Sequence, residues 1–378
     1  MSRTRQRVVR PVAAVLALVL VLAGCLSPES AIRGHEAARD ARMPKRVSMV
    51  IPYDVGGGTD VWARFMAPYL QQHLASHPSF LPENIPGGES ITGSNQFVER
   101  AGTDGERVLI TSGTTYFQAL LGREEVRFDF TKLVPLILNG TGGVIYVSSE
   151  SGVKSVEDLR DPPKQLVYGG ISATGLDLSV LVAFELLGLD VETTFGFEGR
   201  GPAALALQRG ELNIDYQTTS AYHQQVEPLV KDGKARALMS MGWLDENGEV
   251  TRDPQLPKLP TVIDVYEKLT GEKPSGEAYE AYKAFLAAGF AYQKGLWVNP
   301  GTPDSITSEY YDSVEKLRDD ENFVTKGEAA LGGYPIYSGR EVGDSVRKAF
   351  DLDPAVRTYV LRMLETKYDT KVKTKQGP

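Results

Sequence analysis

The sequence predicts an α/β protein built as two lobes, and three observations support this fold class. From Lys45 onward, short runs rich in β-forming residues alternate with segments of helical period, as βαβ units around a parallel sheet require. Turns that contain glycine join a strand to a helix in both halves of this region. The roughly 350 residues that follow position 24 also suit two lobes of about 100 to 200 residues each.

We expect the first lobe to comprise residues 45–143 and 295–378, and the second lobe residues 144–294. In the first lobe, strands are predicted at 47–51, 107–111 and 296–298. A helix follows the first strand, because apolar residues recur there in two adjacent rows: Val61, Phe65 and Tyr69, and Trp62, Met66 and Leu70. Thr59 or Asp60 is expected to cap this helix, and Pro68 to kink it. Another helix is expected to begin at Thr302-Pro303.

The second lobe is predicted to repeat the same alternation. The expected strands are residues 144–148, 166–168, 193–197 and 212–216, and the expected helices are residues 176–187 and 202–208. The following segment, 245–288, is polar with two helical stretches, and we interpret it as an inserted elaboration.

The first 24 residues have the composition of an export signal. Four arginines precede an apolar run at 12–23, and small residues stand just before Cys25. The run is short for a membrane span of about 20 residues, although an uncleaved anchor is the alternative. Leu22-Ala23-Gly24-Cys25 resembles a bacterial lipobox, which implies lipidation of Cys25 as the mature N-terminus. Residues 25–44 then form a tether, and the single cysteine excludes disulfides.

The charge balance argues against some classes of binding partner. The whole chain has 41 basic and 49 acidic residues, a net charge of −8, and without residues 1–24 it has 37 and 49, a net charge of −12. Such an excess of acid argues against nucleic acid or an anionic membrane surface as partner. A small anion is still allowed, because oriented N–H groups act within about 3 Å while bulk charge is screened beyond about 8 Å.

The glycine turn at 56–58 is the first candidate site. Three glycines between a strand and a helix let the backbone approach a ligand, and the free N–H groups of the helix start favour an anion. The turn lacks the Gly-Lys-Ser/Thr ending of a phosphate loop, and Val61 replaces the third small residue of a dinucleotide fingerprint. A plain tight turn is the alternative.

Other chemistry-bearing residues give weaker signals. His73 and His77 have the spacing of metal ligands on a helix but no third ligand, so a solvated helix end is the better interpretation and no metal or cofactor is expected. Residues 88–92 nearly match a nucleophile elbow, with only His223 as downstream base, which supports a serine hydrolase weakly. Arg200 precedes a helix and is either a bidentate carboxylate ligand or an exposed turn residue.

Six motifs together resemble the solute-binding proteins of tripartite tricarboxylate transporters, the Bug-type periplasmic receptors. They follow the family's order over residues 45–345: VIPYDVGGGTD at 50–60, ENIPGG at 83–88, FEGRGPA at 197–203, GKARAL at 233–238, LPT at 259–261 and PGTP at 300–303. The resemblance implies a two-lobed, periplasmic-binding-protein-like (flytrap) fold with a ligand cleft between the lobes. It also implies a monomer without catalytic residues that captures a small carboxylate and delivers it to a membrane permease.

The resemblance also implies a set of ligand contacts from both lobes. Those expected from the first lobe are Tyr53, Gly57, Gly58, Thr59, Ser112, Thr114 and Thr115. Those expected from the second lobe are Ser172, Ala173, Thr174, Arg200, Gly201 and Gln217. Gln217 stands where the family commonly has Asp, and the stretch after Tyr168 lacks the family's run of glycine and serine ending in His. Two alternatives stay open: a secreted hydrolase that uses the same cleft, and a ligand sensor for a signalling receptor.

Overall fold

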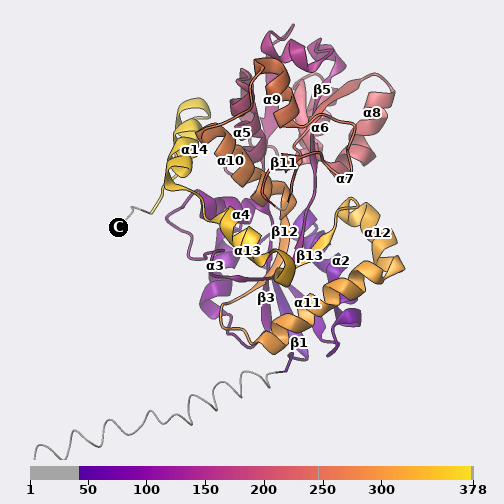
Figure 1. Ribbon diagram of the computed structural model, residues 1–378, viewed down its shortest axis with the longest axis vertical. Coiled ribbons are helices and arrows are strands. Elements are labelled where there is room, and N and C mark those ends of the chain that lie inside the picture. Colours follow the sequence, from indigo (N-terminus) through magenta and orange to yellow (C-terminus); the bar gives the residue numbers. More distant parts are fainter. Residues whose placement is uncertain (1–41, 246, 376–378) are drawn as a thin grey trace, which may run out of the picture.

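The computed structural model describes residues 42–245 and 247–375 (Figure 1). The export signal, Cys25 and most of the expected tether lie outside the described residues. In the part of the chain that is described, no helix has the length and apolarity needed to cross a membrane.

The first lobe is built on a six-stranded sheet of order β13-β4-β12-β3-β1-β2. Its strands are β1 (Arg46–Ile51), β2 (Ser79–Asn84), β3 (Arg107–Thr111), β4 (Val134–Asn139), β12 (Lys294–Val298) and β13 (Ile336–Ser338). Its helices are α2 (Gly58–His73), α3 (Ile91–Arg100), α4 (Gly113–Leu120), α11 (Asp304–Asp319), α12 (Glu321–Leu331) and α13 (Gly339–Phe350). Strands β1, β2 and β3 are parallel, whereas β12 runs antiparallel to β3 and β4.

Helix α2 buries one of its two predicted apolar rows more completely than the other. Trp62, Met66 and Leu70 are buried in the first-lobe core, whereas Val61 in the neighbouring predicted row is exposed. The helix continues through Pro68. It begins after Gly57, so the prediction of Thr59 or Asp60 as the capping residue was wrong by two or three positions.

The second lobe is built on a five-stranded sheet of order β7-β6-β8-β5-β9. Its strands are β5 (Gly143–Ser148), β6 (Leu166–Gly170), β7 (Val191–Phe195), β8 (Ile214–Thr218) and β9 (Ala235–Ser240). The helices after them are α5 (Asp177–Leu187), α6 (Arg200–Gln208), α7 (Thr219–Ala221) and α8 (Glu227–Lys231). Most predicted strands are confirmed within two residues, and the shift is largest at β7 and β8.

The segment predicted to be an insertion is part of the second-lobe core. Strand β10 (Trp243–Leu244) lies just before this segment and pairs with β11 (Val250–Thr251) inside it, and α9 (Val262–Thr270) and α10 (Glu277–Leu286) follow. Helix α10 packs against α5 and against the C-terminal helix α14 (Pro354–Lys367), with Tyr282, Phe285 and Leu286 buried. Tyr359 and Lys367 of α14 both bond Glu185 of α5, so the end of the chain returns to the second lobe (Figure 1).

The strands of the two sheets end at the junction of the lobes. The chain passes from β4 to β5 through residues 140–142, and from α10 back to β12 through the π-helical turn Ala287–Ala291. Phe117 of α4 and Phe285 of α10 make an edge contact with ring centroids 4.8 Å apart. A continuous buried apolar cluster therefore joins the lobes beneath the strand ends.

Candidate functional site

Strand polarity determines which residues meet between the lobes. In the first sheet, the carboxyl ends of β1, β3 and β4 and the amino end of β12 share one edge, since Thr111 pairs with Gly295 and Asn139 with Lys294. In the second sheet, the carboxyl ends of β6 and β8 share an edge with Gly143, where β5 leaves the crossing. Open α/β sheets bind ligands at such edges. The loops at these two edges are called here the interlobe site.

The glycine turn leads directly into the amino end of α2. Gly57 is the N-cap, without a side-chain capping bond, and Thr59 and Asp60 lie in the first turn. The N–H of Gly56 donates to Asp60 Oδ2 at 2.8 Å, and Arg64 Nε donates to both carboxylate oxygens at 2.9 Å. Its hydrogen bond with Arg64 lowers the pKa of Asp60 to about 2. The Asp60 carboxylate is therefore already bonded within the protein, by the Gly56 N–H and by Arg64. The positive end of the α2 dipole still favours an anion.

Tyr53 stands at the centre of a hydroxyl cluster beside this turn. Its Oη lies 2.7 Å from Thr115 Oγ1. Burial raises the pKa of Tyr53, and hydrogen bonding with Thr115, Ser90 and Ser112 opposes that rise. Thr115 and Ser112 form the capping box of α4. The loop after β1 therefore supplies Tyr53, and the segment after β3 supplies Ser112 and Thr115. Ser90 was not among the predicted contacts, although it lies in the near-match to the nucleophile elbow.

The loop after β6 connects the second lobe to the first. Ser172 Oγ lies 3.1 Å from Thr174 Oγ1, and Thr174 Oγ1 donates to Glu89 Oε2 at 2.7 Å. Gln118 Nε2 donates to the carbonyls of Thr114 and Thr174 at 3.1 and 3.0 Å. The structure therefore brings Thr114, Ser172 and Thr174 together, with buried Ala173 between the last two.

Arg200 lies within the second lobe, bound to carboxylates of the protein itself. Its guanidinium pairs with Asp177 Oδ1 at 2.9 Å and with Asp215 Oδ1, and both carboxylates are almost fully buried. Its Cζ lies 4.5 Å from the ring centroid of Tyr216, and Tyr146 donates to Asp215 Oδ2 at 2.7 Å. Asp177 in turn accepts the N–H groups of residues 171 and 172 at 2.9 and 3.3 Å. Arg200 thereby supports the loop that carries Ser172.

The other second-lobe residues of the predicted set are placed near Arg200. Gln217 is buried, and its Nε2 donates to the Arg200 carbonyl at 3.3 Å. Gly201 follows in α6, where no atom outside its own helix lies close to the position of a Cβ. The site residues from the second lobe thus form two groups, the loop 172–174 and the Arg200 cluster.

Lys294 is an interlobe residue that the sequence analysis did not identify. It begins β12 opposite Asn139, and its Nζ donates to Thr59 Oγ1 at 3.0 Å. Burial lowers the pKa of Lys294 to about 8. No motif marked this lysine, because its proximity to the glycine turn arises from the antiparallel return of β12, 235 residues after Thr59.

The residues considered for other chemistry have ordinary partners. His73 Nε2 lies 2.7 Å from Asp320 Oδ2, and His77 Nδ1 lies 2.9 Å from the Gln71 carbonyl. His223, the expected base of a hydrolase, pairs with Glu227 at 2.9 Å, whereas Ser90 lies in the Tyr53 cluster. Among the described residues, no group of three or more His, Cys, Asp or Glu side chains is arranged to hold a metal ion.

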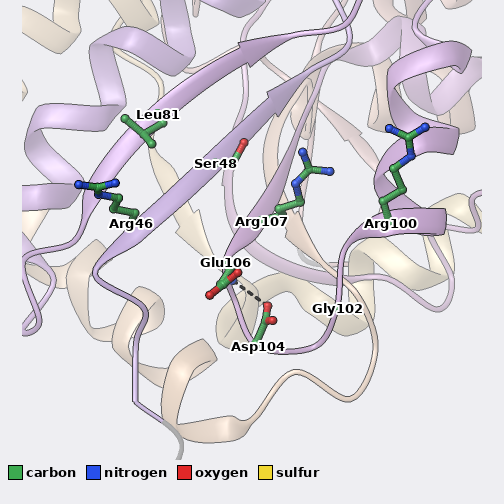
Figure 2. Close-up of a pocket in the computed structure, with 8 residues that line it drawn as sticks. All are labelled: Arg46, Ser48, Leu81, Arg100, Gly102, Asp104, Glu106 and Arg107. Atoms are coloured by element: carbon green, nitrogen blue, oxygen red, sulfur yellow. Dashed lines mark hydrogen bonds between the residues drawn. The ribbon is translucent and has the colours of Figure 1, made fainter.

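A pocket of about 480 Å³ lies at the opposite edge of the first sheet. Figure 2 shows Arg46 at the start of β1 and Arg107 at the start of β3, with Arg100 at the end of α3 and Asp104 in the loop that follows it. Arg107 is already paired with Glu83 at 2.8 Å. This pocket lies at the amino ends of the strands, so it is separate from the interlobe site.

Two curated proteins are similar to this chain in sequence. The UPF0065 protein in the tcbD-tcbE intergenic region of Pseudomonas sp. (strain P51) is 24% identical over 253 residues, covering 65% of this chain and 70% of that protein. Protein BugT of Bordetella pertussis is 22% identical over 260 residues, covering 67% and 73%. The chain is thus similar in sequence to a Bug protein. No protein-family model matches it.

Several solved structures have the same fold as this chain. A TctC solute-binding protein from Polaromonas has a TM-score of 0.62 and 19% identity, covering 85% of this chain and 99% of that one. MatC from Rhodopseudomonas palustris with bound malate has a TM-score of 0.57 and 18% identity, covering 84% and 100%. Rpa4515 of the same organism with adipate has a TM-score of 0.57 and 20% identity, covering 85% and 98%. The predicted two-lobed fold is confirmed.

Proposed function

We propose that this protein is an extracytoplasmic receptor that captures a small carboxylate and delivers it to a permease of the tripartite tricarboxylate type, without covalent chemistry. The observation that carries the proposal is the opposition of two strand-end edges, with the glycine turn and the start of α2 at one and the Ser172–Thr174 loop at the other. The malate and adipate bound by the two Rhodopseudomonas proteins support a carboxylate as ligand class.

Binding follows from the polar groups at these edges. The N–H groups of the turn and the positive end of the α2 dipole attract a carboxylate, while hydroxyls of the Tyr53 cluster and of the 172–174 loop orient it. A ligand that contacts both lobes has its highest affinity for the form in which they are closest, so it shifts the equilibrium toward that form. The closed form would be the one that the permease recognises.

The proposed contacts fall into direct and supporting groups. The direct contacts are Tyr53, Gly57, Gly58, Thr59, Ser112, Thr114, Thr115, Ser172, Ala173 and Thr174. Arg200, Gly201 and Gln217 support them, because the Arg200 guanidinium holds Asp177 and Asp177 holds the N–H groups of the 172–174 loop. We further propose that export and lipidation at Cys25 tether a monomeric receptor to the extracytoplasmic face of the membrane.

Thermal denaturation in the presence of small carboxylates tests this function. A ligand that binds only the folded state at about 100 times its Kd stabilises it by about 2.7 kcal/mol, so malate, succinate, adipate or benzoate should raise the Tm by several degrees. The corresponding neutral amides are the control, and they should leave the Tm unchanged. If no carboxylate of the panel shifts the Tm, the proposed ligand class is wrong.

Ser172→Leu is expected to weaken the binding of whichever panel carboxylate binds the wild type by roughly tenfold. The larger side chain removes the hydroxyl bonded to Thr174 and fills the second-lobe edge of the site. Calorimetry would measure the change, with Ser275→Leu at an exposed loop position as the matched control. Equal affinities for the wild type and Ser172→Leu would count against the placement of the ligand beside this loop.

The hydrolase alternative makes a different chemical prediction. An enzyme would convert the bound carboxylate, whereas a receptor releases it intact. Mass spectrometry of the carboxylate after prolonged incubation with the protein separates the two, and any conversion that depends on Ser90 would favour the hydrolase.

A further inference from the structure

Lys294 is a cation at the interlobe site whose described contacts include no carboxylate. Its Nζ donates to Thr59 Oγ1 at 3.0 Å, and the described hydrogen bonds and ion pairs leave its other two N–H groups without an acceptor. Burial alone accounts for its lowered pKa, with no contribution from a nearby charge. Lys294 is half-buried, and an ammonium group that is partly removed from water without a counter-ion is costly to the folded protein.

The neighbours of Lys294 add positive rather than negative potential. Thr59 lies in the first turn of α2, where the helix dipole is positive. Asp60 in the same turn is paired with Arg64 and bonded to the Gly56 N–H and to Asn84. The residue opposite Lys294 across the sheet is the neutral Asn139, whose amide bonds Trp62 and the Pro335 carbonyl.

The other cations near the interlobe site already have protein counter-ions. Arg200 is shared by Asp177 and Asp215, so that cluster of three has a net charge of −1. Arg123 pairs with Glu89 at 2.8 Å. Of the interlobe cations that the structure describes, Lys294 is therefore the one available to an anionic ligand.

We propose that the Lys294 ammonium pairs with a carboxylate group of the bound ligand, in the space between the glycine turn and the start of β12. This inference rests on the proposed function and specifies the orientation of the bound ligand. The carboxylate lies against the first lobe, and the rest of the ligand extends toward Ser172–Thr174 and the net negative Arg200 cluster. Arg200 then takes part by supporting the second-lobe loop.

Lys294→Met is the central test, since it keeps the aliphatic stem and removes the charge. Calorimetry with malate, succinate, adipate and benzoate should show about 10- to 100-fold weaker binding to the variant than to the wild type. Without ligand, the variant should melt at or above the wild-type temperature, because a partly buried charge is removed. Lys132→Met, at a lysine that is 75% exposed on the first lobe, is the matched control and should bind as the wild type does.

The pH dependence of binding gives a second readout. A bound carboxylate favours the charged lysine, so wild-type affinity should be constant below pH 8 and fall by up to about tenfold per pH unit above it. The variant should show no such fall up to pH 9.5. The titratable or charged groups on the elements packed against Lys294 include Asp60, Arg64, Tyr53, Arg107, Tyr292 and Tyr337, and Tyr69 and His73 lie toward the other end of α2. Asp60 is paired with Arg64, Arg107 with Glu83 and His73 with Asp320, and burial raises the pKa of Tyr53, Tyr292 and Tyr337.

The stability of the unliganded protein should rise with pH, whereas the affinity for the carboxylate should fall. The pKa of Lys294 is lower in the folded state than its ordinary value of 10.5, so the unfolded state binds more protons between pH 8 and 10.5. Wild-type stability relative to Lys294→Met should therefore rise through that window.

The outcomes separate the inference from the proposed function. Wild-type binding of a carboxylate that is equally tight in Lys294→Met would overturn the Lys294 assignment and leave the receptor function intact. A pH profile of affinity shared by the wild type and the variant would do the same. Failure of the wild type to bind any carboxylate of the panel would overturn both.

Discussion

Arg200→Met is expected to lower the free energy of unfolding by about 3 to 5 kcal/mol, because it leaves two buried carboxylates without their cation. Asp177 and Asp215 are about 1% and 0% exposed, and both pair with the Arg200 guanidinium. Urea unfolding followed by circular dichroism would measure the loss.

Two further variants test whether charge causes the Arg200 effect. Arg209→Met removes an exposed arginine that caps the same helix, and it should change stability by no more than about 0.5 kcal/mol. Arg200→Met combined with Asp177→Asn and Asp215→Asn removes all three charges and should recover part of the loss. A loss below about 1 kcal/mol in Arg200→Met would contradict the interpretation of this cluster as a buried ion network.

Gly142→Ala is expected to cost about 3 kcal/mol or more, because it disrupts a buried network between the lobes. Tyr334 Oη of the first lobe donates to Asp253 Oδ1 at 2.7 Å and lies 2.9 Å from Thr219 Oγ1, both in the second lobe. A Cβ at Gly142 would lie well inside van der Waals contact with all three side chains. Because Gly142 lies on the crossing from β4 to β5, the variant should also bind carboxylates more weakly. Urea unfolding and calorimetry measure the two effects.

Gly327→Ala is the matched control for Gly142→Ala. It lies inside α12, where an added Cβ meets Leu331 at an ordinary 3.4 Å, so the change should be neutral or stabilising by about 0.5 to 1 kcal/mol. Tyr334→Phe keeps the backbone of the crossing and removes only the hydroxyl that bonds Asp253. If Gly142→Ala unfolds at the same urea concentration as the wild type, the crossing is less tightly packed than the structure indicates.

The local structure could be predicted from the sequence because it depends on short-range patterns. Hydrophobic period placed β3 at 107–111 and β5 and α5 within one residue of their observed starts. The glycine turn at 56–58 was identified because three glycines between a strand and a helix have few other uses. The loops after β3 and β6, and Tyr53 after β1, were assigned to the site only through the resemblance to Bug-type receptors. The structure places them at the carboxyl ends of parallel strands, where open α/β sheets bind ligands.

The pairing of charged residues could not be predicted in this way. Arg200 was expected to meet either solvent or a ligand, and the structure pairs it with Asp177 and Asp215 because β6 and β8 are neighbours in the sheet. The polar segment 245–288 was interpreted as an inserted elaboration. Its buried side chains are spaced at helical intervals, and only the position of α5 shows what they pack against.

The sequence by itself determined the α/β class, the two-lobed organisation and the anion-favouring turn, because each depends on residues close together in the chain. The tertiary structure alone decided which charges are paired inside the protein and which have no described counter-ion. Lys294 lies beside Thr59 only because β12 returns antiparallel to β3 after the chain has built the whole second lobe. A contact across 235 residues is set by sheet order and packing, which leave no local trace in the sequence.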